Sequence, residues 1–195
     1  MTAPRSDIRS ATQDRSAVPV GAWHVDPARS HASFAARVAG KSVRGRLPLI
    51  GTVNVAASIE ESIAHLVALA NEVSTGNHML DRLLAGPGFL DIEDYPTISL
   101  RSQMLVCVPT GWRVVGQLQV KGVEHPIVCE LEADLRSAQP HTFAATMILT
   151  TRWVLDSTWI TTQRLPTLSR RIAMSCSLVL DPAHDASVGD PTPAA

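Results

Sequence analysis

The chain has 195 residues, of which 45% are apolar and 18% are charged, and its formal net charge is −1. The apolar fraction excludes a disordered polymer, and the length is sufficient for one domain with its own hydrophobic core. The mixed and nearly balanced charges disfavour nucleic acid as a partner, because such binding needs a basic surface. No run of about 18 apolar residues occurs, so we expect no transmembrane helix.

The two ends of the chain differ from its middle. Residues 1–20 are polar and lack apolar periodicity, which predicts a flexible N-terminal leader, and residues 182–195 predict a flexible tail of the same kind. One domain is therefore expected over 21–181. The leader lacks the apolar segment of a secretory signal, and the three cysteines are widely spaced without a C-x-x-C motif. Both features predict a cytoplasmic protein.

Six segments between residues 30 and 180 alternate apolar and polar side chains with a period of two, as β-strands do. Each is apolar on one face only, which is typical of antiparallel sheets with one wet face. Because six or more such strands must hide their edges, we predict an all-β, antiparallel barrel or sandwich. Cys129 and Cys176 fall on the apolar faces. The larger residues expected on these inner faces are Phe34, Val38, Leu100, Met104, Trp112, Leu118, Phe143, Met147, Trp153 and Met174.

The segment that follows Ser58 does not alternate clearly. Ser58 and Glu61 have the spacing of a capping box, and the apolar residues after them recur at helical spacing. The local pattern therefore predicts a helix. The alternative is a strand, interrupted by polar residues, whose apolar face would hold Ile63, Val67, Leu69 and Val73.

Residues 74–96 are dense in Asp, Asn, His and Gly, as a metal or catalytic site would be. His78 and Asp81 are three residues apart, but the acidic residues beyond them follow Gly86-Pro87-Gly88, which breaks any helix. The block matches no metal-binding motif. We interpret it as a short amphipathic helix near residues 77–90 with turns at both ends. Its apolar side would hold Leu80, Leu83, Leu84 and Phe89.

Positive signals for catalysis are missing from the sequence. It contains no G-x-S-x-G elbow, no G-x-G-x-x-G and no P-loop, and the histidines are scattered singly. An enzyme using Asp81, His125 or His78 as acid or base stays as an alternative without a motif. We expect neither a metal nor a cofactor.

The interior of the predicted barrel has two interpretations. A barrel of about eight strands can be packed solid with side chains, or it can enclose one small apolar ligand. Small residues on the inner faces, at Ala32, Ala36, Ala133 and Ala145, favour a cavity. A solid barrel would instead serve as an interaction or dimerisation module, and the pattern leaves both readings open.

The order of motifs resembles the YceI-like family over residues 23–180. The segments that carry the resemblance are WHVDPARS at 23–30, FAARV at 34–38, VRGRL at 43–47, STGN at 74–77 with Asp81 and Leu84, FLDIEDYP at 89–96, and VGQLQVKGV at 115–123 followed by Pro126. The chain departs from the family pattern at three positions. Arg29 stands where a histidine is usual, and Leu80 and Leu83 stand where arginine and histidine are usual.

This resemblance implies a lipocalin-like barrel of about eight strands that holds a long apolar molecule, such as a polyisoprenoid or an isoprenoid quinone. It also makes residues 60–73 a strand, against the local helix pattern. We therefore expect a non-catalytic lipid-binding protein, with a homodimer as a further candidate assembly. Thr75, Asn77 and Asp81 would be structural hydrogen-bonding residues. The expected ligand lining comprises the ten inner-face residues given above together with Leu83, Leu84 and Phe89.

Overall fold

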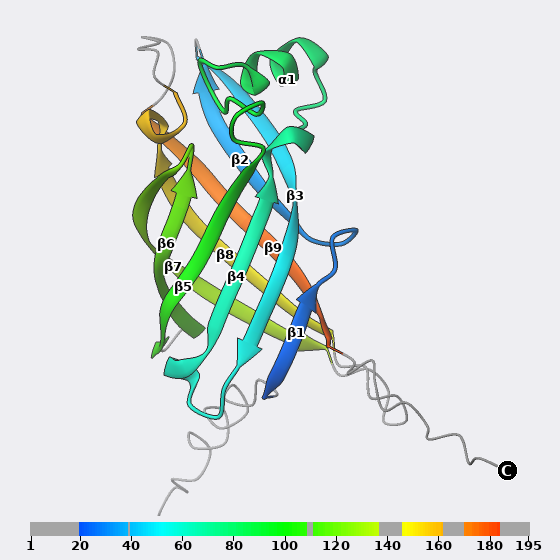
Figure 1. The fold of residues 1–195 in the computed structure, drawn as a ribbon, viewed down its shortest axis with the longest axis vertical. Coiled ribbons are helices and arrows are strands. Elements are labelled where there is room, and N and C mark those ends of the chain that lie inside the picture. The colour runs from blue at the N-terminus through cyan, green and yellow to red at the C-terminus, as the bar shows by residue number, and fades with distance from the viewer. Residues whose placement is uncertain (1–19, 39, 109–110, 137–145, 162–169, 184–195) are drawn as a thin grey trace, which may run out of the picture.

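The computed structural model of the protein describes residues 20–38, 40–108, 111–136, 146–161 and 170–183 (Figure 1). This part of the chain forms one α-helix, α1 (His78–Ala85), and three 3-10 turns, η1 (Ile59–Glu61), η2 (Ala70–Glu72) and η3 (Ser157–Trp159). The strands in it are β1 (Gly21–Val25), β2 (His31–Val38), β3 (Lys41–Val55), β4 (Ile63–Leu69), β5 (Thr97–Val108), β6 (Gly111–Val120), β7 (Val123–Arg136), β8 (Thr146–Asp156) and β9 (Arg171–Pro182).

The sheet closes on itself. Strands β2 to β9 pair antiparallel with their neighbours in chain order, and β9 pairs back onto β2. The short strand β1 pairs with both β3 and β9, at the end of the barrel that β2 does not reach. Eight strands thus make the barrel, and β1 lies between β3 and β9 beyond the end of β2. α1 lies over one end of the barrel (Figure 1). The predicted all-β antiparallel barrel of about eight strands with a short helix is confirmed.

The inner face of the barrel holds the hydrophobic core. Leu180 is completely buried, and Trp23, Leu47 and Leu178 are nearly so. Each such side chain contributes about 1.5–3 kcal/mol when it leaves water. Cys129 and Cys176 are buried among them as expected, and burial, with a smaller effect of Cys129, raises the pKa of the Cys176 thiol to about 12.

The segment after Ser58 contains strand β4 between the 3-10 turns η1 and η2, so the helix that its local pattern predicts is wrong. The strand implied by the family resemblance is present, but it spans Ile63–Leu69 and not the expected 60–73. β4 pairs with β3 on one edge and with β5 on the other. These two ladders satisfy its backbone groups and override the helical preference of the sequence. The inner face holds Leu66 and Ala68, whereas Ile63 is 56% exposed, so the apolar face suggested for a strand is also wrong.

Strand β5 contains a bulge that reverses its faces. Its register with β6 shifts between Ser102 and Met104. Ser102 is buried, and its Oγ accepts a hydrogen bond from the Ala64 amide at 2.7 Å. After the bulge Leu105 points inward, while Met104 is 44% exposed. The prediction that Met104 lines the interior is therefore wrong, because one extra residue in the strand turns it outward.

The boundaries predicted for the domain concern mainly residues that the structure does not describe. Of the expected leader and tail, only Val20, Pro182 and Ala183 are described. β9 continues to Pro182, one residue beyond the expected limit. In the described part of the chain, no helix has both the length and the apolar character that crossing a membrane requires.

Candidate functional site: an apolar cavity beneath helix α1

The chain leaves the barrel after β4 and crosses its end before returning as β5 (Figure 1). Ser74 pairs with Arg46 of β3 through two backbone hydrogen bonds of 2.8 and 3.0 Å. α1 then begins after Asn77, whose side-chain oxygen accepts hydrogen bonds from the amides of Met79 and Leu80 at 3.0 and 3.3 Å. An asparagine N-cap of this kind satisfies amides that a helix leaves unpaired.

Asp81 ties the first turn of α1 to the segment that enters it. Its Oδ1 accepts hydrogen bonds from the amide and the hydroxyl of Thr75, both at 2.6 Å. The hydroxyl bond is the main reason that the pKa of Asp81 lies below its ordinary value, despite the opposing effect of desolvation. Thr75, Asn77 and Asp81, expected to be structural hydrogen-bonding residues, thus fix the start of the helix.

A cavity of about 120 Å³ lies between α1 and the end of the barrel; we call it the mouth cavity. All of its described lining residues are apolar. They come from β2, β3, α1 and the loop after it, β5, the η3 loop and β9, and are Phe34, Ala36, Val43, Leu47, Leu80, Leu83, Leu84, Phe89, Leu90, Ile98, Ile160, Ile172 and Met174.

A second cavity of about 50 Å³, the inner cavity, lies deeper in the barrel and shares Leu47, Ile98 and Met174 with the mouth cavity. The interior is therefore hollow at the α1 end and not packed solid. A dry apolar cavity of about 150 Å³ can hold a benzene-sized molecule. The mouth cavity, at about 120 Å³, thus admits a group of about five carbons. The other residues around the inner cavity are Ala32, Leu49, Leu66, Ala68, Leu100, Leu118 and Cys176.

The predicted lining residues fall into three groups. Seven line one or both cavities: Phe34, Leu83, Leu84, Phe89, Leu100, Leu118 and Met174. Trp112 is buried but lines neither cavity, and Met104 points outward. Phe143 lies outside the described residues, and for Val38, Met147 and Trp153 only the strand positions are described, opposite Lys41, Leu180 and Met174.

Several lining residues were not predicted. Leu47 and Ile98 lie at inward positions of β3 and β5, so strand alternation could have identified them. The sequence pattern places Leu80 on the apolar side of the helix, and the structure shows that it also lines the mouth cavity. Leu90 and Ile160 follow a turn and a short 3-10 segment, and neither has a periodic pattern that would reveal its direction.

The loop from Gly86 to Asp91, which carries Phe89 into the mouth cavity, is fastened through its backbone. Lys121 Nζ donates hydrogen bonds to the carbonyl oxygens of Pro87 and Phe89 at 3.2 and 2.9 Å and lies 3.9 Å from Asp91 Oδ2. Lys121 occupies the two-residue turn between β6 and β7 with a φ of 49°, as a type I′ turn requires. The Thr161 hydroxyl adds a bond of 2.8 Å to the Gly88 carbonyl.

Replacing Lys121 with methionine should loosen this loop selectively. The loss of charge-assisted hydrogen bonds is expected to lower the free energy of unfolding by about 2 kcal/mol. We call α1 and the loop that follows it as far as Ile92 the cap. Hydrogen exchange should accelerate at the amides of Leu90, Asp91 and Ile92, which donate hydrogen bonds to carbonyl oxygens of residues 84–86, and stay unchanged in the barrel strands. The exposed Lys41→Met serves as the control. Unchanged exchange at residues 90–92 in Lys121→Met would contradict the fastening role.

Phe34 forms one wall of the mouth cavity by lying across Gly45 of β3. A Cβ added at Gly45 would lie 2.4 Å from the edge of the Phe34 ring, so only glycine leaves room for this ring position. Gly45 is thus required by space and not by backbone conformation. The VRGRL motif therefore has a direct role in shaping the cavity.

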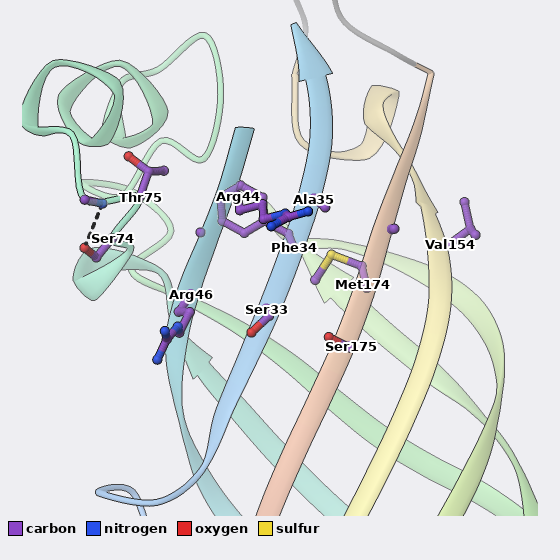
Figure 2. A pocket seen from close by; sticks show the side chains of 13 residues that line it. Ser33, Phe34, Ala35, Arg44, Arg46, Ser74, Thr75, Val154, Met174 and Ser175 are labelled. Atoms are coloured by element: carbon purple, nitrogen blue, oxygen red, sulfur yellow. Dashed lines mark hydrogen bonds between the residues drawn. The ribbon is translucent and has the colours of Figure 1, made fainter. Parts of the chain in front are cut away.

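Outside the barrel, β3, β2, β9 and β8 present a broad hollow of about 1050 Å³, which we call the outer hollow and which reaches the segment before α1 (Figure 2). The centre of this hollow is recessed because the outward side chains of β2 and β9 at that position are small. Arg44 and Arg46 border it beside Thr75, and Val154 stands on the opposite side (Figure 2). The small residues between them are Ser33, Ala35, Ala173 and Ser175.

The groups considered for acid–base chemistry have other neighbours. The His125 ring stacks on Trp159 with centroids 4.1 Å apart, His78 is exposed on α1, and Asp81 is bonded to Thr75. None of the three lines the mouth or inner cavity as described. Among the described residues, no three His, Cys, Asp or Glu side chains come together as metal ligands would.

Solved structures with the same fold include proteins from three bacteria. BcnA of Burkholderia cenocepacia has a TM-score of 0.71 and 16% identity, with 80% of this chain and 98% of BcnA covered. The YCEI protein of Campylobacter jejuni has a TM-score of 0.66 and 16% identity, covering 74% and 87%. A polyisoprenoid binding domain from Saccharophagus degradans, implicated in plant cell wall breakdown, has a TM-score of 0.61 and 14% identity, covering 82% and 98%.

At these identities the likeness establishes the fold and nothing further. No curated protein matches the sequence. The YceI-like domain family, however, matches residues 23–180, the same span over which the motifs run in order. Because that match covers well over half of the 195 residues, this protein belongs to the YceI-like family.

Proposed function

We propose that this protein binds a long apolar molecule of the isoprenoid class, a polyisoprenoid or an isoprenoid quinone, and encloses part of its tail beneath α1 without chemical reaction. The observation that carries the proposal is the mouth cavity, whose described lining is apolar throughout. The polyisoprenoid binding domain of S. degradans, with the same fold, supports the ligand class.

Burial alone can supply the affinity. Each methylene transferred from water into such a cavity contributes about 0.8 kcal/mol, so an isoprenoid tail needs no charged contact to bind. The family's usual arginine and histidine are replaced here by Leu80 and Leu83, both of which line the mouth cavity. These substitutions make the entrance more apolar, which favours the tail of the ligand over its head group as the recognised part.

The mouth cavity is smaller than a long isoprenoid. It admits a group of about five carbons, so a longer tail must displace the leucines of α1 and the loop that carries Phe89. The inner cavity lies directly beyond, sharing Met174 with the mouth cavity, and would receive the advancing tail. We therefore propose a cap that moves when the ligand enters.

The test is organic extraction of protein purified gently from its host, with mass spectrometry of the extract against a mock purification. A stoichiometric isoprenoid or quinone is the expected result, and it would identify the ligand. Protein that arrives empty should be offered prenols of increasing length. If it still retains none of them, the proposal is wrong.

Cytoplasmic location and homodimerisation, both expected from the sequence, stay predictions. No observation favours an enzyme acting on the same ligand.

A further inference from the structure

α1 carries two apolar edges, and one of them faces solvent. Leu80 and Leu84 line the mouth cavity, whereas Met79 is 83% exposed and Leu83 is 53% exposed while still lining the cavity. Met79 and Leu83 are four residues apart and therefore lie on the same face of the helix. Leu83 thus makes the exposed apolar edge continuous with the interior of the barrel.

Basic side chains lie on α1 itself and on β3, next to the segment that enters the helix. Arg82 is exposed on α1, and the exposed Arg44 and Arg46 border the outer hollow beside Thr75, just before the helix (Figure 2). Within the described part of the chain, none of the three has an ion-pair partner.

The acidic groups near the helix offset these charges only in part. Asp81 keeps its negative charge, because its partner Thr75 is neutral and the hydrogen bond lowers the pKa of the carboxyl, whereas Asp91 lies near Lys121. The exposed Glu93 and Asp94 belong to the loop beyond the cap, which leads away from α1 into β5. α1 and β3 carry Lys41, Arg44, Arg46 and Arg82 against Asp81 as their one acidic residue, so this side of the cap has a net positive charge next to exposed apolar side chains.

We propose that this surface docks onto an anionic phospholipid bilayer, with Met79 and Leu83 entering the interface and Arg44, Arg46 and Arg82 contacting lipid phosphates. Exposed apolar patches mark protein or membrane interaction sites, and apolar side chains flanked by basic residues suit a membrane surface. Continuity with the mouth cavity favours the bilayer, because an isoprenoid could then pass from lipid to barrel without crossing water. The inference extends the proposed function, since it names the source of the ligand.

The test is flotation of the full chain with ligand-free vesicles of phosphatidylcholine alone and of an equal mixture with phosphatidylglycerol. We expect binding to the anionic vesicles that weakens with salt. Met79→Ser should reduce the partition coefficient about tenfold, because the thioether side chain no longer enters the interface. Arg44→Gln and Arg82→Gln should each reduce it about fivefold at low salt.

Matched controls come from the opposite side of the barrel. Val128→Ser removes a side chain that is 59% exposed on β7, and Arg113→Gln removes an arginine that pairs with Glu130 at 3.3 Å. Both should bind vesicles as the parent does. Thermal melts check that every variant is folded. Absence of flotation, equal losses in the control variants, or self-association through Met79 in place of vesicle binding would each overturn the proposal.

Ligand retention is measured separately, so the two proposals can fail independently. Met79 does not line either cavity as described, and Met79→Ser should therefore retain added prenol like the parent. Vesicle binding without any retained isoprenoid would leave the docking surface standing and reject the proposed function. Retention of isoprenoid without vesicle binding would leave the proposed function standing and reject the docking surface.

Discussion

Replacement of Leu84 with aspartate is expected to abolish the retention of an isoprenoid. Leu84 projects from α1 into the mouth cavity, where the described lining has no polar group to pair with a carboxylate. Burying an unpaired polar group costs several kcal/mol, so the affinity should fall by roughly a hundredfold or more. The measurement is displacement of a fluorescent prenol analogue, together with extraction and mass spectrometry.

Two further variants separate loss of binding from loss of folding. Leu84→Met keeps the volume and apolar character of the side chain and should bind nearly as the parent does. Asn54→Asp introduces the same charge on the exposed outer face of β3 and should have no effect. If folded Leu84→Asp still binds the analogue like Leu84→Met, the mouth cavity is not the binding site.

Gly45→Ala should have the second largest effect, through Phe34. The new methyl group would lie 2.4 Å from the ring, and the ring would have to turn away from β3 toward the mouth cavity. Overpacking of this kind costs about 1–3 kcal/mol of stability. Ligand affinity should fall together with stability, because the displaced ring would occupy the space that receives the tail.

A double variant identifies the cause. Phe34→Leu removes the ring that clashes, so Gly45→Ala combined with it should recover most of the lost stability and affinity. Gly86→Ala is the control within the cap, since its Cβ would be 3.5 Å from the nearest atom, the Leu83 carbonyl oxygen, at ordinary van der Waals distance. Normal binding by Gly45→Ala alone would show that the ring position does not matter.

The barrel could be predicted from the sequence because each strand repeats a local signal. Apolar and polar side chains alternate along the sequences of β2, β6 and β9, and a strand that is apolar on one face must pair and close. This alternation correctly identified Phe34, Leu118 and Met174 as inward residues. The short helix was also predictable, since Asn77 and the breaking Gly86-Pro87-Gly88 mark its ends.

The errors arose where distant parts of the chain decide the local structure. Residues 59–73 carry helical spacing, and only the pairing partners β3 and β5 make β4 a strand. Met104 follows the alternation of β5, but the bulge at Ser102 depends on the register with β6. The hollow interior likewise depends on how side chains from several strands meet, which no single periodicity specifies.

The hydrogen bonds that hold the cap in place determine how the protein's preference among ligands could change. Lys121 and Thr161 hold carbonyl oxygens of the loop at residues 87–89, and every residue type supplies such an oxygen. Phe89 and Leu90 can therefore be exchanged for larger or smaller side chains without removing these bonds. A protein built in this way can evolve, or be engineered, toward apolar ligands of different thickness while its cap closes by the same contacts.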